Sequence, residues 1–181
     1  YIKDYRGCIL QHIDNKDIRD RYGNGMYAMH RAALQEQLVK SLAKPVQWGK
    51  KLTHVQQGEH AVEAQFADGT TTTGTLLIGA DGIRSVVRDK YITPAQYRYS
   101  GQTCWRAIVP ITLPAEEQVY SAEIWGGGNG LRASYMQVGE NQVYFWFTKK
   151  TPAGTEFESE AALALIRTEL APFRGYMQQV L

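Results

Sequence analysis

The string at positions 79–88 holds the residue types best suited to chemistry in this chain. It reads Gly-Ala-Asp-Gly-Ile-Arg-Ser-Val-Val-Arg and follows the apolar run 76–80, which predicts a short, doubly buried strand of a parallel sheet. Gly82 would let the backbone approach a ligand, and Ser85 suits the cap of a helical turn whose free amides favour phosphate. Asp81 would then lie at the carboxyl end of the strand, where open α/β sheets bind ligands. The alternative is a plain strand-to-helix turn.

Two arginines elsewhere in the chain lie within sequence patterns that predict a helix and a strand. Arg31 opens a predicted amphipathic helix in the string His-Arg-Ala-Ala-Leu-Gln-Glu-Gln-Leu, and its planar, permanently charged guanidinium suits a phosphate or an electron-rich ring edge. His30 before it is better explained as a capping or packing residue. Arg106 follows Trp105 in a predicted strand, so these two side chains should lie on opposite faces. Trp105 fits the core better than a substrate contact, and Arg106 could meet a flavin or a substrate carboxylate.

String 79–88 resembles the Asp-Gly motif of the FAD-dependent aromatic hydroxylases, the single-component flavoprotein monooxygenases related to salicylate, hydroxybenzoate and hydroxynicotinate hydroxylases. The family pattern Gly-Ala-Asp-Gly-x-x-Ser-x-x-Arg lies against the FAD pyrophosphate and is implicated in engaging NAD(P)H. Every defined position matches, which implies cofactor contacts at Gly79, Ala80, Asp81, Gly82, Ser85 and Arg88.

The resemblance extends to both arginine strings. The family carries an arginine at the start of a similar helix, which implies that Arg31 contacts FAD. It also has a Gly-x-x-x-Trp-Arg string entering the substrate domain, matched here at residues 101–106, which makes Trp105 and Arg106 substrate-side candidates. No catalytic residue can be chosen from the sequence.

The activity implied is hydroxylation of a small aromatic substrate with FAD, NAD(P)H and O2. Alternatives are a related FAD-dependent epoxidase, halogenase or reductase, or a non-catalytic binding module of the same fold. Two other family motifs, an N-terminal Gly-x-Gly-x-x-Gly loop and a C-terminal Gly-Asp, are not found in the sequence. We therefore expect an internal piece of a longer enzyme that alone binds FAD weakly or not at all, is inactive and self-associates.

The elements that must position these residues fall into two kinds. A helix over residues 26–43 with a buried leucine stripe and a hairpin around Asp68-Gly69 precede string 79–88. An antiparallel meander over 99–148 and a helix over 158–170 follow it, with a second helical piece after residue 174. The expected fold combines α/β and α+β parts: a partial Rossmann-like FAD-binding domain over 1–90, then a partial antiparallel-sheet substrate-binding domain over 91–181.

The composition of the chain limits the classes of partner that it is expected to bind. The chain has 181 residues, of which 44% are hydrophobic and 21% charged, and a net charge of only +2, which argues against a nucleic-acid or acidic-membrane surface. No signal peptide or apolar run of membrane-spanning length is present, so a cytoplasmic location is expected. Cys8 and Cys104 lack the spacing of a metal site, and we expect both to be structural.

Overall fold

The computed structural model describes the chain except residues 120, 127 and 129. It contains two compact units, one formed by Tyr1–Lys40 and Tyr99–Leu181 and the other by Ser41–Arg98. The first, larger unit holds a six-stranded sheet and the second holds a three-stranded sheet. The mixed α/β character that the sequence predicts is confirmed in this arrangement.

The larger unit is built on a sheet with strand order β2-β1-β7-β8-β9-β6. The strands are β1 (Ile2–Asp4), β2 (Ile9–Gln11), β6 (Gln102–Val109), β7 (Ala122–Trp125), β8 (Arg132–Gly139) and β9 (Gln142–Lys150). All neighbours are antiparallel except β1 and β7, which are parallel. The predicted meander is therefore confirmed in β7 to β9, whereas β6 pairs with β9 instead of with the next strand in sequence, β7. The expected strand over 119–125 and the glycine turn over 126–130 each include positions outside the described residues.

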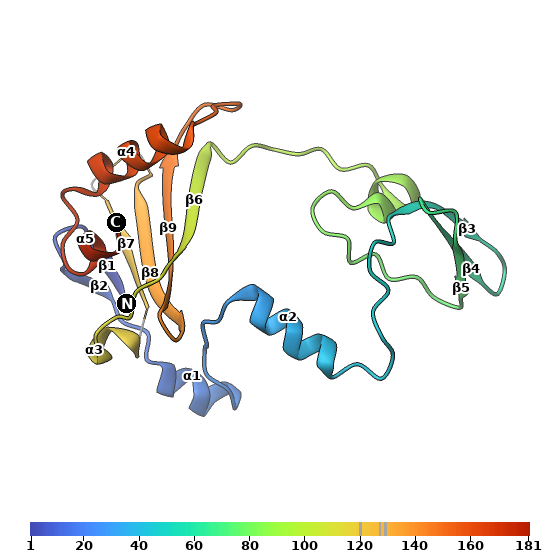
Figure 1. Cartoon of the computed structure of the whole chain (residues 1–181), viewed down its shortest axis with the longest axis horizontal. Coiled ribbons are helices and arrows are strands. Elements are labelled where there is room, and N and C mark those ends of the chain that lie inside the picture. The colour runs from blue at the N-terminus through green and yellow to red at the C-terminus, as the bar shows by residue number, and fades with distance from the viewer. Residues whose placement is uncertain (120, 127, 129) are drawn as a thin grey trace. The chain divides into compact units, whose positions relative to one another are not determined.

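Helices cover one face of this sheet. Figure 1 shows α4 (Ser159–Leu170) and α5 (Met177–Val180) beside the strands. Alternate side chains of β8 and β9 join them in one core, with Phe147, Leu170 and Met177 fully buried. The short helix α3 (Ala115–Gln118) contributes Glu117, whose carboxylate accepts a buried hydrogen bond from the Tyr135 hydroxyl at 3.0 Å. The helix predicted at 158–170 is thus confirmed, and the piece after residue 174 is α5.

The leucine stripe near residue 34 lies on a shorter helix than expected. Helix α1 (Asn15–Tyr22) is capped by Asp14, and α2 spans Arg31–Lys40, not 26–43. The prediction that the stripe is buried is wrong, because Leu34, Leu38 and Leu42 are 43%, 58% and 54% exposed. Periodicity predicts which face of a helix is apolar, but it does not supply the surface that would cover that face.

The smaller unit contains an antiparallel sheet of order β3-β4-β5, formed by β3 (Leu52–Gln57), β4 (Val62–Phe66) and β5 (Thr71–Gly74). The turn predicted at Asp68-Gly69 joins β4 to β5, with Gly69 at φ +80°. Lys50 braces this turn through an ion pair of 2.5 Å with Asp68. A π-helical turn, η1 (Arg88–Ile92), docks on β3 through Tyr91, whose hydroxyl accepts from the Val55 amide at 2.6 Å.

The apolar run 76–80 is not a buried strand. Leu76 and Ile78 are 76% and 77% exposed, and none of the strands in the described part of the chain pairs with this run. A strand needs a neighbour to satisfy its backbone groups, and an apolar sequence cannot provide one by itself. That prediction is wrong for this structure.

The compact units divide the chain differently from the expected functional domains. The junction at Tyr99 lies beside the expected boundary near residue 90, but residues 1–40 pack with 99–181 because β1 pairs with β7. The functional division into 1–90 and 91–181 stays a prediction.

No described helix is both long and apolar enough to cross a bilayer. The described histidine, cysteine, aspartate and glutamate side chains form no group of three that could hold a metal ion.

Candidate cofactor and substrate sites

Loop 79–88, in the smaller unit, is organised by the Asp81 carboxylate. Its Oδ1 accepts from the Ser85 hydroxyl at 2.5 Å, and its Oδ2 accepts from the amides of Val86 and Val87 at 2.6 and 3.3 Å. The buried Ser85 hydroxyl in turn accepts from the Arg88 amide at 3.0 Å. The hydrogen bond from Ser85, supported by those from the amides, lowers the pKa of Asp81. Asp81 therefore caps this turn.

Arg88 is bonded within the same unit. Its Nη2 donates to the Ile83 carbonyl at 2.7 Å and to the Tyr97 hydroxyl at 3.0 Å, and its Nε donates to Asp89 at 2.8 Å. The hydrogen bond to Asp89 contributes most to raising the pKa of the Arg88 guanidinium above its ordinary value. This side chain fastens the two ends of segment 83–97 together.

The small residues of the loop leave its backbone accessible. A Cβ on Gly79 would meet the Val87 side chain at 2.8 Å, and Gly82 has a φ of +79° that favours glycine. Residues 79–84 are all exposed, and the amides of residues 82–84 donate no hydrogen bond among the described residues. Free amides at the start of a helical turn suit an anionic group, so this donor set fits a cofactor pyrophosphate.

Arg31 lies in the larger unit at the start of α2. His30 caps this helix, because its Nδ1 accepts from the Ala32 amide at 3.2 Å, which confirms the capping interpretation. The exposed guanidinium of Arg31 forms no hydrogen bond or ion pair with any residue that the structure describes. It is available to a ligand.

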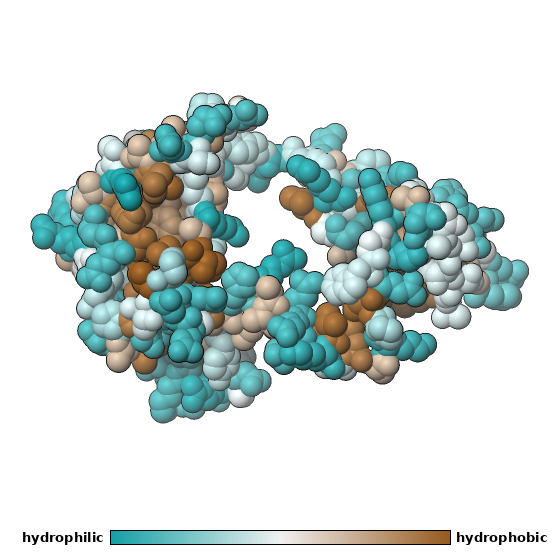
Figure 2. Space-filling model, in the orientation of Figure 1, coloured by the Kyte–Doolittle hydropathy of each residue, from teal (hydrophilic) through white to brown (hydrophobic). Residues whose placement is uncertain are grey.

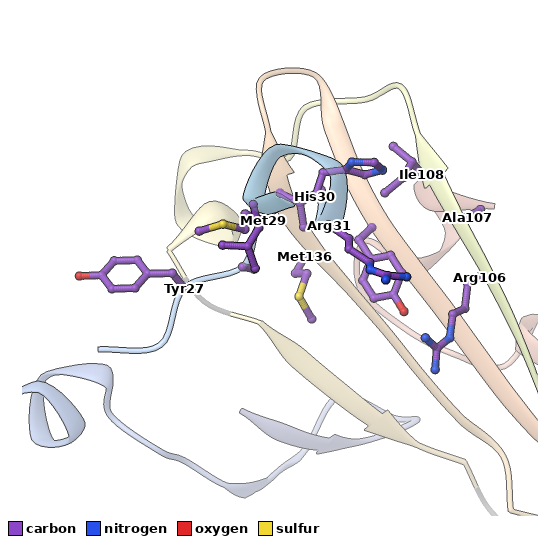
Figure 3. A pocket seen from close by; sticks show the side chains of 12 residues that line it. Tyr27, Met29, His30, Arg31, Arg106, Ala107, Ile108 and Met136 are labelled. Atoms are coloured by element: carbon purple, nitrogen blue, oxygen red, sulfur yellow. The ribbon is translucent and has the colours of Figure 1, made fainter. Parts of the chain in front are cut away.

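A hollow of about 630 Å³ lies on the open face of the large sheet, whose side chains alternate along the strands with those that pack in the core with α4 and α5. Figure 3 shows its lining side chains from close by. Strands β6, β8 and β9, the segment before α2 and the first turn of α2 form its walls. The lining residues are Tyr27, Ala28, Met29, His30, Arg31, Leu34, Arg106, Ala107, Ile108, Met136, Val138 and Tyr144. Most are apolar, which suits a small organic molecule with a few polar groups.

Strand alternation separates the two substrate-side candidates, as predicted. Trp105 is partly buried and packs against the core, with its ring centroid 5.3 Å from that of Phe147 and 5.0 Å from that of Phe157. Arg106 lies on the open face and lines the hollow, where its Nε donates to Cys104 Sγ at 3.3 Å. Trp105 therefore lies on the sheet face opposite Arg106, and its role on the substrate side stays a prediction.

The structure brings Arg31 and Arg106 to one hollow, although 75 positions separate them in sequence. The residues of loop 79–88 are assembled with one another in the smaller unit.

Sequence reasoning missed Met136 and Tyr144 as residues that line the hollow. Their alternation within strands was visible, but the register Ile108↔Tyr144↔Met136 that aligns them across the sheet was not.

Comparisons with known proteins agree on one group of enzymes. The aurachin C monooxygenase/isomerase of Stigmatella aurantiaca is 32% identical over 80% of this chain and 37% of that protein. The FAD-dependent urate hydroxylase of Klebsiella pneumoniae is 34% identical over 75% of this chain and 35% of that protein. No family model matches the chain.

A solved structure shares the fold over almost the whole chain. The Klebsiella pneumoniae protein HpxO, complexed with FAD and uric acid, superposes with a TM-score of 0.81 and 26% identity. The match covers 99% of this chain and 47% of HpxO, so the chain spans less than half the length of the relatives it matches. The sequence motif, the assembled loop and these matches lead to one conclusion: the chain belongs to the family of FAD-dependent monooxygenases.

Proposed function

We propose that the protein hydroxylates a small aromatic substrate, using FAD, NAD(P)H and O2. The observation that carries this proposal is the apolar hollow lined by Arg31 and Arg106 in a member of this family. When bound, FAD supplies the redox chemistry that activates O2. The work left to the protein is to bind and orient the ring and to keep water away from it.

The cofactor-binding residues are proposed to lie within 1–90, in a partial Rossmann-like part of the whole protein. Loop 79–88 would hold the FAD pyrophosphate through the exposed backbone of Gly79, Ala80 and Gly82. Asp81, Ser85 and Arg88 support that role by fixing the loop from inside, since their polar atoms are bonded within it. Arg31 is proposed as a further FAD contact.

The substrate-binding part is proposed to lie within 91–181. The open face of β6, β8 and β9 supplies apolar walls, including Ile108 and Met136, that would pack on a flat ring. Arg106 is the charged group on this face of the hollow. Because the walls are apolar, a bound ring would displace water from them.

Flavin binding tests the cofactor half of the proposal. The purified protein is incubated with excess FAD and desalted, and the retained visible absorbance of oxidised flavin is measured. Because a weakly bound flavin would be lost on desalting, FAD fluorescence is also titrated before that step. A substitution Gly82→Val should abolish binding, since valine disfavours φ +79° and would distort the loop.

Gly154→Val is the matched control. Gly154 has a φ of +75°, and like Gly82 its added Cβ would contact nothing within 4 Å, but it belongs to the larger unit and not to the unit that holds loop 79–88. Equal FAD binding by both variants would refute the role of the loop. Substrate-dependent NAD(P)H oxidation with incorporation of one oxygen atom from O2 is the test of the activity itself.

A further inference from the structure

We infer that Asn15 is a positioning residue that holds one wall of the hollow in place and, through that wall, the start of α2 with Arg31. The inference rests on the proposed function, in which Arg31 is a FAD contact. It follows from two hydrogen bonds of the Asn15 side chain, from the segment that they hold and from a glycine that leaves room for them.

The Asn15 side chain bonds to both main-chain polar groups of Met26. The Met26 amide donates to Asn15 Oδ1 at 2.7 Å, and Asn15 Nδ2 donates to the Met26 carbonyl at 3.2 Å. These two hydrogen bonds, the Asn15 clamp, join residues that are 11 positions apart in the chain. A side-chain amide offers one donor group and one acceptor, so it can satisfy both polar groups of a peptide segment that has no neighbouring strand.

The clamp holds a segment that has little other support. Residues 24–29 belong to no helix or strand, and most of them are exposed. Among the residues that the structure describes, this segment forms no hydrogen bond other than the two with Asn15. Residues 27–30 nevertheless line the hollow, and Arg31 follows them directly. The position of this wall therefore depends on the clamp at one end and on the start of α2 at the other.

Gly25 leaves the space that the clamp occupies. A Cβ on Gly25 would lie 2.7 Å from Asn15 Oδ1 and 3.1 Å from Asn15 Cγ and Nδ2, which is too close for packed atoms. The φ of Gly25 lies outside the left-handed region, so glycine supplies room at this position and not a special backbone conformation. Alanine at position 25 should therefore push the Asn15 side chain away from Met26.

The clamp ties the wall to α1. This helix begins at Asn15, is capped by Asp14 and follows β2, the edge strand of the large sheet. Gly23, at φ +80°, ends the helix, and the chain then returns to its first residue through Met26. A wall that is tied down in this way is ordered before a ligand arrives, which reduces the entropy cost of binding.

The four methionines of the chain test the inference in NMR spectra of protein that is isotope-labelled at the methionine methyl groups. Met26 is the clamped residue, Met29 and Met136 line the hollow from the wall and from β8 (Figure 3), and Met177 is fully buried in the core. In Asn15→Ala, the Met26 and Met29 signals should narrow and move toward those of an unfolded chain, whereas the Met177 signal should not move. Unchanged Met26 and Met29 signals, or a Met177 signal that moves with them, would overturn the inference.

A FAD titration measures what the clamp contributes to binding. The flavin fluorescence gives the dissociation constant of FAD, which should increase about tenfold in Asn15→Ala, because two hydrogen bonds are lost and the ligand must order the wall. Asn15→Asp keeps the acceptor for the Met26 amide and loses the donor to the Met26 carbonyl, so its dissociation constant should lie between those of Asn15→Ala and wild type. An unchanged dissociation constant in Asn15→Ala would contradict the positioning role.

Gly25→Ala disturbs the clamp from the other side. It should reproduce the changes that Asn15→Ala causes in the Met26 and Met29 signals. The double variant should show no larger change than Asn15→Ala, because both substitutions remove the same contact, and additive changes would contradict the clamp. Asn24→Ala is the matched control: Asn24 is an exposed asparagine of the same segment that forms no hydrogen bond with any described residue, and its loss should change neither readout.

The two readouts separate this inference from the proposed function. Methyl signals that respond as expected in a protein that never binds FAD would support the Asn15 clamp and contradict the proposed cofactor site. A protein that binds FAD equally well with and without the clamp would support the cofactor site and contradict the inference.

Discussion

Asp81 shows how a motif residue can serve a ligand without touching it. Both of its carboxylate oxygens are used inside the loop, by the Ser85 hydroxyl and by two backbone amides. Arg88 is similarly occupied by Ile83, Tyr97 and Asp89. The residue types of the motif are therefore explained by the shape of the loop, and the proposed cofactor contacts fall to the exposed backbone that these side chains arrange.

Replacing Asp81 should loosen this loop. In Asp81→Asn the side chain loses its charge and one acceptor oxygen, so the amides of Val86 and Val87 should exchange hydrogen faster. Hydrogen exchange followed by NMR or mass spectrometry measures this. Asp17→Asn is the control, because it changes a carboxylate in the first turn of α1 in the other unit. Unchanged protection of both amides would show that Asp81 is not the cap.

The pH dependence of the same loop follows from the lowered pKa of Asp81. A carboxyl group whose pKa is lower in the folded state than its ordinary value of 3.8 stabilises the folded state at pH values above 3.8. This contribution to stability is lost as the pH falls through the pKa of the folded state. Protection of the loop amides in wild type should thus decrease below about pH 3.8, while Asp81→Asn should show a smaller change.

At the scale of elements, α4 holds the helical layer on the large sheet. It buries Ala162, Ile166 and Leu170, which recur at helical spacing, and Ile166 and Leu170 join the core that includes residues of strands β8 and β9. Other positions of the helix are exposed, among them Leu163 at 44%. The same periodicity in α2 leaves its leucines exposed, so the difference between the two helices lies in what packs on them.

Truncation of α4 side chains should measure this packing. Leu170→Ala removes a fully buried side chain and should lower the free energy of unfolding by about 2–5 kcal/mol. Leu163→Ala, the matched control on the same helix, should change it by less than about 0.5 kcal/mol. Urea unfolding followed by circular dichroism provides the comparison. Similar losses in both variants would mean that α4 does not pack as described.

At the scale of the whole molecule, the exposed apolar side chains are the notable feature. Figure 2 shows apolar surface on both units. In the smaller unit Leu76, Ile78 and Ile83 are each more than three-quarters exposed. Large apolar side chains left in water favour association with other surfaces. The expectation that this chain self-associates therefore stands as a prediction.

Sedimentation velocity at several protein concentrations tests the prediction of self-association. We expect the average mass of the wild-type chain to increase with concentration, and the double substitution Leu76→Ser and Ile78→Ser to reduce this increase. Val119→Ser is the control, because Val119 is equally exposed, at 77%, but belongs to the larger unit. A wild-type chain that stays monomeric at every concentration would contradict the prediction.

The sequence by itself determined the family, the antiparallel meander of β7 to β9, the hairpin at Asp68-Gly69 and the helix at 158–170. These features depend on local rules: motif spacing, turn chemistry and the period of apolar residues. Even the opposite orientation of Trp105 and Arg106 follows from the alternation of side chains along one strand.

Only the tertiary structure decided what each apolar surface meets. It brought Arg31 and Arg106 to one hollow, packed Trp105 against the core, paired β1 with β7 and left Leu76 and the α2 leucines exposed. These outcomes depend on strand register and on contacts between residues far apart in the chain. Local propensity and pattern contain no such information, because burial is a property of two surfaces and a sequence segment describes one of them.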